Sequence, residues 1–278
     1  MDEFLTFSHL YRRFDLSEPW LARMIYRRPK KFLDAVDDVS FSIERGKTYA
    51  LVGESGSGKS TIARMAVGLL TPTSGEIRID GHNLHDRHLS EAEHRRIRQR
   101  LQMVFQSPFA SLNPRWRVGS ILAEPLRVFH LVDGQAAETA RVHELLEQVG
   151  LSASDARRFP HEFSGGQRQR ISIARALASK PDFIVCDEPT SALDVSVQAQ
   201  VLNLLKQLQQ DLGLTYLFIT HDLAVVRVMA HRIGVLKSGK LVEEQSTEEL
   251  IESPQSDYTR MLIRSAPRIH RKAEVAAG

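Results

Sequence analysis

The sequence predicts an α/β fold built on an open, largely parallel β-sheet, and three observations carry that prediction. Short apolar runs of strand length alternate with stretches of helical periodicity. A glycine-rich stretch joins one of these strands directly to a helix. Several strands end in polar side chains, and open parallel sheets bind their ligands at the carboxyl ends of strands. We therefore expect one binding site along that edge of the sheet.

Length and composition are those of an ordinary globular protein. The chain has 278 residues, of which 42% are hydrophobic and 26% are charged, enough to bury a full core in one large or two small domains. The formal net charge of +3 is too small to indicate a nucleic-acid partner. Cys186 is the single cysteine, which excludes a disulfide framework and a Cys-rich metal site and fits a reducing compartment.

The sequence gives no sign of a membrane span or a secretion signal. No apolar run reaches 18 residues, the length at which a bilayer-spanning helix is expected. The first residues lack the charged-then-apolar layout of a signal peptide. We expect the protein to stay in the cytoplasm and to depend on other subunits if it works at a membrane.

The chain begins with two predicted strands, residues 4–10 and 36–43, the second identified by its alternation of apolar and polar residues. A basic segment separates them, with Trp20, Tyr26 and Phe32 among its aromatic residues. We interpret this segment as an exposed loop rather than as a nucleic-acid surface because it is short.

Residues 53–60 match G-x-x-x-x-G-K-[ST], the phosphate-binding loop of nucleotide hydrolases. A buried strand at 48–52 precedes the loop and a helix start follows it, so backbone N–H groups and the helix dipole point at one place. Lys59 can then reach the β- and γ-phosphates, and the Ser60 hydroxyl can complete a Mg²⁺ shell. A chance glycine-rich turn is the alternative, which the flanking strand and helix disfavour. The predicted phosphate-binding residues are Gly53, Glu54, Ser55, Gly56, Ser57, Gly58, Lys59, Ser60 and Thr61.

The middle of the chain carries a strand and then a helical insertion. Residues 85–100 are rich in arginine and are predicted to form a solvated helix face, and the strand at 101–105 delivers Gln106 at its end. Residues 108–163 have helical character, with apolar residues at helical spacing between Val142 and Val149 and with Gly150 at the expected helix end.

An aromatic residue of the basic N-terminal segment could stack on an adenine ring, and the sequence leaves open which one.

A second glycine-rich helix start follows the insertion. Ser164 is a predicted N-cap, and Gln167 stands three residues later as its capping-box partner. One interpretation is simply a well-capped helix; the functional one is a second anion-binding helix N-terminus.

Two adjacent carboxylates, Asp187 and Glu188, follow the apolar strand at 183–186. Such a pair is costly at the end of a buried strand unless a metal or a reaction uses it. In phosphate-loop hydrolases the first binds Mg²⁺ and the second can orient the attacking water; capping of the following helix is the alternative. The next apolar strand, 214–220, delivers His221, which alone would be an ordinary surface residue. A hairpin around residues 238–239 and helical residues 247–264 follow, and we expect residues 268–278 to be a disordered tail.

In this order the motifs resemble the ATP-binding subunits of ABC transporters. Gln106 corresponds to the Q-loop, residues 164–167 to the signature motif, and Asp187 and Glu188 to the end of the Walker B strand. Residues 191–194 look like the D-loop and His221 like the switch histidine. The resemblance implies a P-loop NTPase fold over residues 1–246, with a RecA-like core (1–106 and 171–246), an antiparallel β subdomain and an inserted α-helical subdomain (107–170). Residues 247–278 would be a short C-terminal extension.

The resemblance also implies ATP and Mg²⁺ as cofactors and a division of labour among the site residues. Catalysis would rest on Glu188, His221 and Gln106, and metal binding on Ser60, Gln106 and Asp187. In the family, the signature motif completes the ATP site of a neighbouring subunit, so the protein should act as a dimer with itself or with a sister ATPase. The residues expected to reach that second ATP are Ser164, Gly166 and Gln167, and Gly165 and Asp194 are further predicted ATP-binding residues.

Finer features are similar to the oligopeptide/dipeptide importer group. They are residues 104–108 followed by 111–115, residues 159–170, and the C-terminal stretch 253–260. The partners implied are two transmembrane permease subunits and, indirectly, an extracytoplasmic solute-binding protein, with this chain on the cytoplasmic face of the inner membrane. Nickel and cationic-peptide importers share these features, and a soluble ABC ATPase of repair or translation is the alternative from another class. The Cys-rich C-terminal motif of some subunits in the group is missing here.

Overall fold

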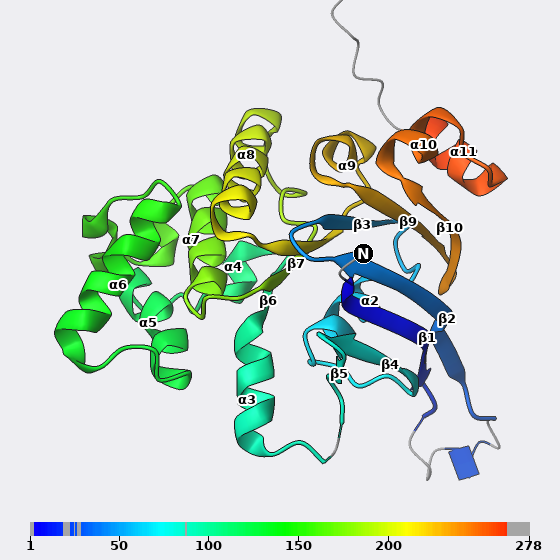
Figure 1. Cartoon of the computed structure of the whole chain (residues 1–278), viewed down its shortest axis with the longest axis horizontal. Coiled ribbons are helices and arrows are strands. Elements are labelled where there is room, and N and C mark those ends of the chain that lie inside the picture. The colour runs from blue at the N-terminus through cyan, green and yellow to red at the C-terminus, as the bar shows by residue number, and fades with distance from the viewer. Residues whose placement is uncertain (1–2, 19–22, 25, 27–28, 87, 266–278) are drawn as a thin grey trace, which may run out of the picture.

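The computed structural model describes residues 3–18, 23–24, 26, 29–86 and 88–265. Trp20 and the predicted tail at 268–278 lie outside these residues. Two β-sheets lie against each other in the part described, and a group of helices stands to one side (Figure 1). None of the helices in those ranges is long and apolar enough to cross a bilayer.

The larger sheet has six strands in the order β10-β9-β3-β8-β7-β6. Five of them run parallel, as predicted, and only β10 runs antiparallel to its neighbour. The central strands are buried on both faces, which explains why they read as continuous apolar runs. The strands are β3 (Thr48–Val52), β6 (Leu101–Val104), β7 (Phe183–Asp187), β8 (Thr215–Ile219), β9 (Arg232–Lys237) and β10 (Lys240–Ser246).

The smaller sheet is antiparallel, in the order β2-β1-β4-β5. Its first two strands are longer than the sequence predicts, because the pairing of β1 with β2 continues past Leu10 through several register shifts. Such bulges break the alternation of apolar and polar residues on which the prediction relied. The strands are β1 (Glu3–Asp15), β2 (Phe32–Glu44), β4 (Ser74–Ile79) and β5 (His82–Asn83).

The helical group follows β6 and ends with a long helix that returns to the sheet. The capping box predicted at Ser164 is present, since its side chain accepts from Gln167 N–H and the Gln167 side chain accepts from Ser164 N–H. The division of the chain at residues 107 and 170 stays a prediction, because the second boundary falls inside a helix that packs on both β6 and the helical group. These helices are α4 (Pro108–Ser111), α5 (Val118–Val128), α6 (Gly134–Gln148) and α7 (Gly165–Leu177).

The remaining helices cover the two faces of the larger sheet. One core lies between the sheets around α2, and a second joins β6, β7 and β8 to α5–α8. A third, smaller core packs α9, α10 and α11 on β3 and β9, at the side of Figure 1 away from the helical group. The exposed, arginine-rich α3 has no buried residue, as predicted. The bounds are α2 (Lys59–Ala66), α3 (Glu91–Arg100), α8 (Val195–Leu212), α9 (Leu223–Met229), α10 (Thr247–Glu252) and α11 (Asp257–Ser265).

The end of α8 gives a test of the helix boundary. Gly213 follows the helix with φ of 66°, and a Cβ there would meet nothing within 4 Å. Gly213→Ala should therefore lower the free energy of unfolding by about 1 kcal/mol through backbone strain alone. Urea denaturation would measure the loss. Gly213→Asn should lose less, because asparagine tolerates this conformation better; an equal loss in both variants would contradict the explanation.

Candidate functional site

The phosphate loop connects β3 to α2, and two of its glycines are required by close backbone contacts. A Cβ at Gly53 would lie 2.1 Å from the Leu236 carbonyl oxygen, and one at Gly58 would lie 2.3 Å from the Ala35 carbonyl oxygen. Both glycines also have positive φ. No other residue fits these two positions without moving the backbone of a neighbouring strand.

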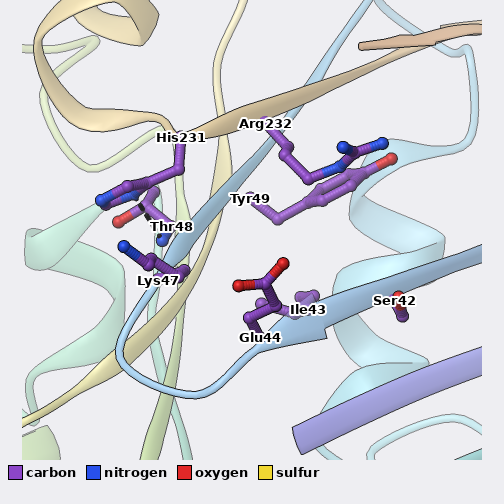
Figure 2. A pocket seen from close by; sticks show the side chains of 8 residues that line it. All are labelled: Ser42, Ile43, Glu44, Lys47, Thr48, Tyr49, His231 and Arg232. Carbon is purple, nitrogen blue, oxygen red and sulfur yellow. Dashed lines mark hydrogen bonds between the residues drawn. The ribbon is translucent and has the colours of Figure 1, made fainter. Parts of the chain in front are cut away.

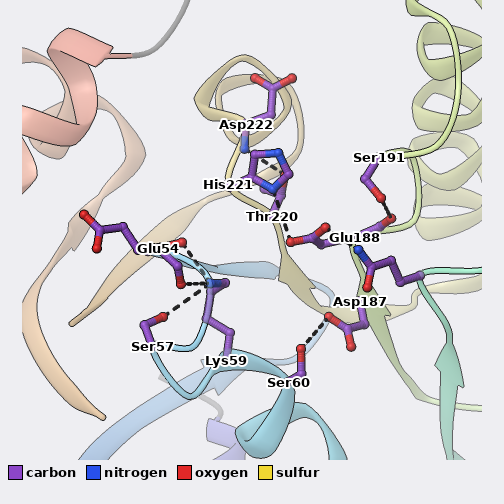
Figure 3. Close-up of polar contacts among 12 residues, drawn as sticks. Glu54, Ser57, Lys59, Ser60, Asp187, Glu188, Ser191, Thr220, His221 and Asp222 are labelled. Atoms are coloured by element: carbon purple, nitrogen blue, oxygen red, sulfur yellow. Dashed lines mark hydrogen bonds and ion pairs between the residues drawn. The ribbon is translucent and has the colours of Figure 1, made fainter. Parts of the chain in front are cut away.

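Lys59, the first residue of α2, points back over the loop (Figure 3). Its ammonium group donates to the carbonyl oxygens of Gly53 at 2.8 Å and Glu54 at 2.7 Å, and to Ser57 Oγ at 3.3 Å. An ammonium has three donors, so a phosphate oxygen must replace one of these contacts, of which that to Ser57 is the longest. Burial lowers the pKa of Lys59, while the carboxylates of Glu188, Asp187 and Glu54 oppose the shift.

Asp187 ends β7 directly beside the start of α2. Its Oδ1 accepts a hydrogen bond of 3.2 Å from Ser60 Oγ, and the residue is only 7% exposed. Burial raises the pKa of Asp187, although the Ser60 hydrogen bond opposes the rise. A buried carboxylate next to a hydroxyl is an oxygen-only donor set, which suits a hard cation such as Mg²⁺. Among the described residues no three His, Cys, Asp or Glu side chains gather, the pattern that zinc would need.

Glu188 is held between the two polar groups that end the neighbouring strands. Gln106 Nε2 donates to Glu188 Oε2 at 2.8 Å, and His221 Nδ1 lies 3.2 Å from Glu188 Oε1. Ser191 Oγ donates to the Glu188 carbonyl oxygen at 3.1 Å. Glu188 has φ of 47°, a strained conformation for a side chain of this type, and such strain tends to occur at functional sites.

These residues line one cleft with a volume of about 670 Å³. Ser55, Gly56, Gly58, Lys59, Ser60 and Thr61 form its floor, and Gln106, Glu188 and His221 one wall. Asp187 lies below it, in contact with Ser60. The structure thus brings the predicted strand-end groups together at one edge of the sheet. The volume of the cleft falls within the range of about 300–1,000 Å³ that is usual for small-molecule sites.

A further part of the cleft lining comes from the β1–β2 hairpin, where the sequence predicted an adenine-stacking aromatic residue without identifying it. It consists of Phe14, Leu33, Asp34 and Ala35. Within the described ranges Phe14 is the aromatic side chain that lines the cleft, and Phe32 does not line it. The Arg12 guanidinium carbon lies 4.7 Å from the centre of the Phe14 ring. The signal in the sequence was an aromatic residue ending a strand, but the strand was predicted to stop before it.

The predicted residues of the second anion site lie apart from this cleft. Ser164, Gly165 and Gln167 start α7, on the helical side of the molecule, and Ser164 and Gly165 are exposed. Asp194 caps α8 by accepting from Val197 N–H at 3.0 Å. Gly166, the fifth predicted residue, is buried. None of the five is among the described residues that line the cleft.

A second cavity, of about 100 Å³, lies at the opposite end of β3 (Figure 2). His231 is one of its walls, and its Nδ1 accepts from Thr48 N–H at 3.0 Å, so that nitrogen carries no proton. Burial and the nearby Lys47 lower the pKa of His231, which keeps the ring neutral and the hydrogen bond intact. The hydrogen bond between His231 and Thr48 thus stabilises the fold at this end of β3.

Comparison with known proteins agrees with this geometry. Residues 36–191 match the family model described as "ABC transporter". The oligopeptide transport ATP-binding protein OppF of Bacillus subtilis is 53% identical over 239 residues, 86% of this chain and 78% of OppF. A Brucella abortus protein, provisionally named a peptide import ATP-binding protein, is 54% identical over 265 residues, 95% of this chain and 77% of its own length. A solved structure, the dimeric post-hydrolysis state of the ATP-binding cassette MJ0796 bound to ADP and phosphate, has a TM-score of 0.73 at 29% identity and covers 87% of this chain and 98% of that one.

Phe14 provides the first test of the cleft. If its ring stacks on the adenine of ATP, Phe14→Ala should weaken ATP binding on the order of tenfold, the scale of one lost stacking contact. Phe14→Tyr keeps the ring and should bind ATP as the native chain does. Fluorescent-nucleotide titration would measure both; equal affinity in all three proteins would exclude the stacking role.

Proposed function

Because the chain belongs to the ABC transporter family and is an ATPase of that family, we propose that it energises an importer of di- or oligopeptides. The observation that carries the proposal is the cleft that unites Lys59, Glu188, Gln106 and His221. The names of the relatives from Bacillus and Brucella support peptides as the solute. Nickel and cationic peptides are the alternative solutes, because importers of these solutes share the same sequence features.

In the proposed reaction, the backbone of residues 53–61 and the Lys59 side chain hold the phosphates of ATP. Glu188 accepts a proton from a water molecule as the water oxygen bonds to the γ-phosphorus and the bond to the bridging oxygen breaks. His221 and Gln106 hold the Glu188 carboxylate and direct it at that water, since both contact it in this structure. Ser60, Gln106 and Asp187 would hold Mg²⁺, which when bound neutralises charge on the phosphates.

The protein would work as a dimer. Ser164, Gly165, Gly166, Gln167 and Asp194 do not line the cleft of their own chain, and an exposed helix N-terminus is a suitable partner for the γ-phosphate of a second subunit. The second subunit would be another copy or a sister ATPase. Closure of the two clefts around ATP would then supply the mechanical step.

An apolar groove beside the cleft is the proposed contact with the permease subunits. It has a volume of about 320 Å³ and lies between the core and the helical group. Leu69 and Val128 are 62% and 56% exposed on its walls, and Phe105 lines it one residue before Gln106. Exposed apolar side chains in a concavity are typical of protein contacts. A permease seated there, with a solute-binding protein on its far side, would keep this chain on the cytoplasmic face of the inner membrane.

Glu188→Gln tests the catalytic proposal. The amide keeps the shape and can still bond Gln106, but it accepts no proton, so ATP turnover should fall at least about a hundredfold. ATP binding should persist, and the variant should accumulate as an ATP-bound dimer. Phosphate release and analytical ultracentrifugation would measure the two effects; turnover at the native rate would refute the assignment.

The same variant tests the solute. Cells that carry the native chain should take up labelled di- and oligopeptides, and cells that carry Glu188→Gln should not. Uptake of peptides that is unaffected, with uptake of nickel lost instead, would keep the ATPase role and replace the solute.

The groove is tested by membrane association. Leu69→Glu places a charge in the proposed permease contact and should reduce the membrane-bound fraction about fivefold, the effect of losing one interface anchor. Val242→Glu, on an exposed face of β10 outside the groove, should not reduce it. Co-sedimentation with membranes would measure both. If the native chain itself remains in the supernatant, the transport role fails and a soluble ABC ATPase is the better description.

A further inference from the structure

The C-terminal helix α11 reaches the phosphate loop. The hydroxyl oxygen of Tyr258 accepts a hydrogen bond of 3.3 Å from the backbone N–H of Glu54, the second residue of the loop. The two residues are 204 positions apart in the sequence. The chain passes through β9, β10 and α10 before α11 packs beside them (Figure 1).

Tyr258 is fixed where it stands. It is 7% exposed and belongs to the core that joins α9–α11 to β3 and β9. The Lys237 ammonium lies 4.7 Å from the centre of its ring, a favourable cation–π contact. Burial raises the pKa of Tyr258, so at neutral pH the hydroxyl is uncharged.

The start of α11 is also tied to the sheet. Glu243 on β10 accepts hydrogen bonds from Gln255 N–H at 2.7 Å and from Ser256 N–H at 2.9 Å, just before the helix. Glu243 is 9% exposed, so both bonds are shielded from water and correspondingly strong. The helix therefore presents Tyr258 to the loop from a rigid support.

The two sides of Glu54 are held by different parts of the protein. Tyr258 binds its N–H, and Lys59 Nζ binds its carbonyl oxygen at 2.7 Å. Lys59 must exchange a partner when a phosphate arrives, as argued above. Glu54, although predicted among the phosphate-binding residues, is not among the described residues that line the cleft, and its N–H is directed at Tyr258 instead. Tyr258 thus restrains the loop while Lys59 changes partners.

We propose that Tyr258 is a positioning residue for the phosphate loop and that α11 couples the C-terminal extension to nucleotide binding. A loop restrained in advance loses less conformational freedom when it binds ATP. By thermodynamic reciprocity, ATP must then stabilise α11 by the same factor by which α11 favours ATP. The inference rests on the phosphate-binding role proposed for residues 53–60.

Tyr258→Phe is the test, because it keeps the buried ring and removes only the hydroxyl. One neutral hydrogen bond contributes about 0.5–1.5 kcal/mol, so KM for ATP should rise roughly two- to tenfold while kcat changes little. The matched control is Tyr216→Phe. Tyr216 is buried and its hydroxyl donates to the Leu205 carbonyl oxygen at 2.9 Å, far from the loop. A KM that is unchanged in Tyr258→Phe, or raised equally in both variants, would overturn the proposal.

Hydrogen exchange distinguishes a positioning role of Tyr258 from a purely structural one, because only the former makes protection of α11 depend on the nucleotide. ADP should slow exchange of the amides of residues 257–265 in the native chain and in Tyr216→Phe, but much less in Tyr258→Phe. Equal protection in all three proteins would also overturn the proposal. Glu243→Gln, which weakens the anchor of α11 and leaves Tyr258 in place, should show an intermediate loss of protection.

Lys59→Ala separates this inference from the function on which it rests. If Lys59→Ala binds ATP as tightly as the native chain, the phosphate-loop assignment fails whatever Tyr258 does. If Lys59→Ala loses ATP while Tyr258→Phe behaves like the native chain, only the role of Tyr258 fails.

Discussion

The phosphate loop lies between the two β-sheets, and its close backbone contacts with both of them are the constraint on which the rest of the site depends. On one side the backbone of Leu236, in the six-stranded sheet, leaves no room for a side chain at Gly53. On the other side the backbone of Ala35, in the four-stranded sheet, leaves none at Gly58. The loop can therefore hold its shape only while both sheets stay in register around it, and a shift of either sheet would move the groups that face the phosphates.

The same junction explains why distant parts of the chain belong to the site. Gly239, in the β9–β10 turn, donates to the Ser57 carbonyl oxygen at 2.9 Å and accepts from Asp37 N–H at 2.8 Å. The turn thus bonds the loop to β2, the strand paired with the end of β1 that carries Phe14. It also begins the strand that leads to α11 and Tyr258. One set of backbone contacts fixes the aromatic wall of the cleft and the support of the loop together.

Local patterns predicted the parts of this site that lie at strand ends. The loop, Gln106 and the Asp187–Glu188 pair follow short apolar strands, and a parallel sheet must bring such ends to one edge. Phe14 could not be predicted in the same way, because bulges extend its strand beyond the last apolar alternation. The contact of Tyr258 with the loop joins two residues far apart in sequence through a hydroxyl, and neither periodicity nor spacing carries information of that kind. Such contacts depend on tertiary packing, which the sequence pattern does not specify locally.

In the proposed dimer, short contacts within each chain would link the signature motif, residues 164–167, to Glu188 of the same chain. A Cβ at Gly166 would lie 2.3 Å from Val197 Cγ1, so the start of α7 rests directly on the start of α8. Val197 N–H is in turn bonded to Asp194, and three residues earlier Ser191 holds the Glu188 carbonyl oxygen. When the signature motif of one chain binds the γ-phosphate in its partner's cleft, a shift of that motif would therefore also move the residues that position Glu188 in its own cleft. The two clefts would then be coupled through packed backbone and small side chains, with no further domain needed.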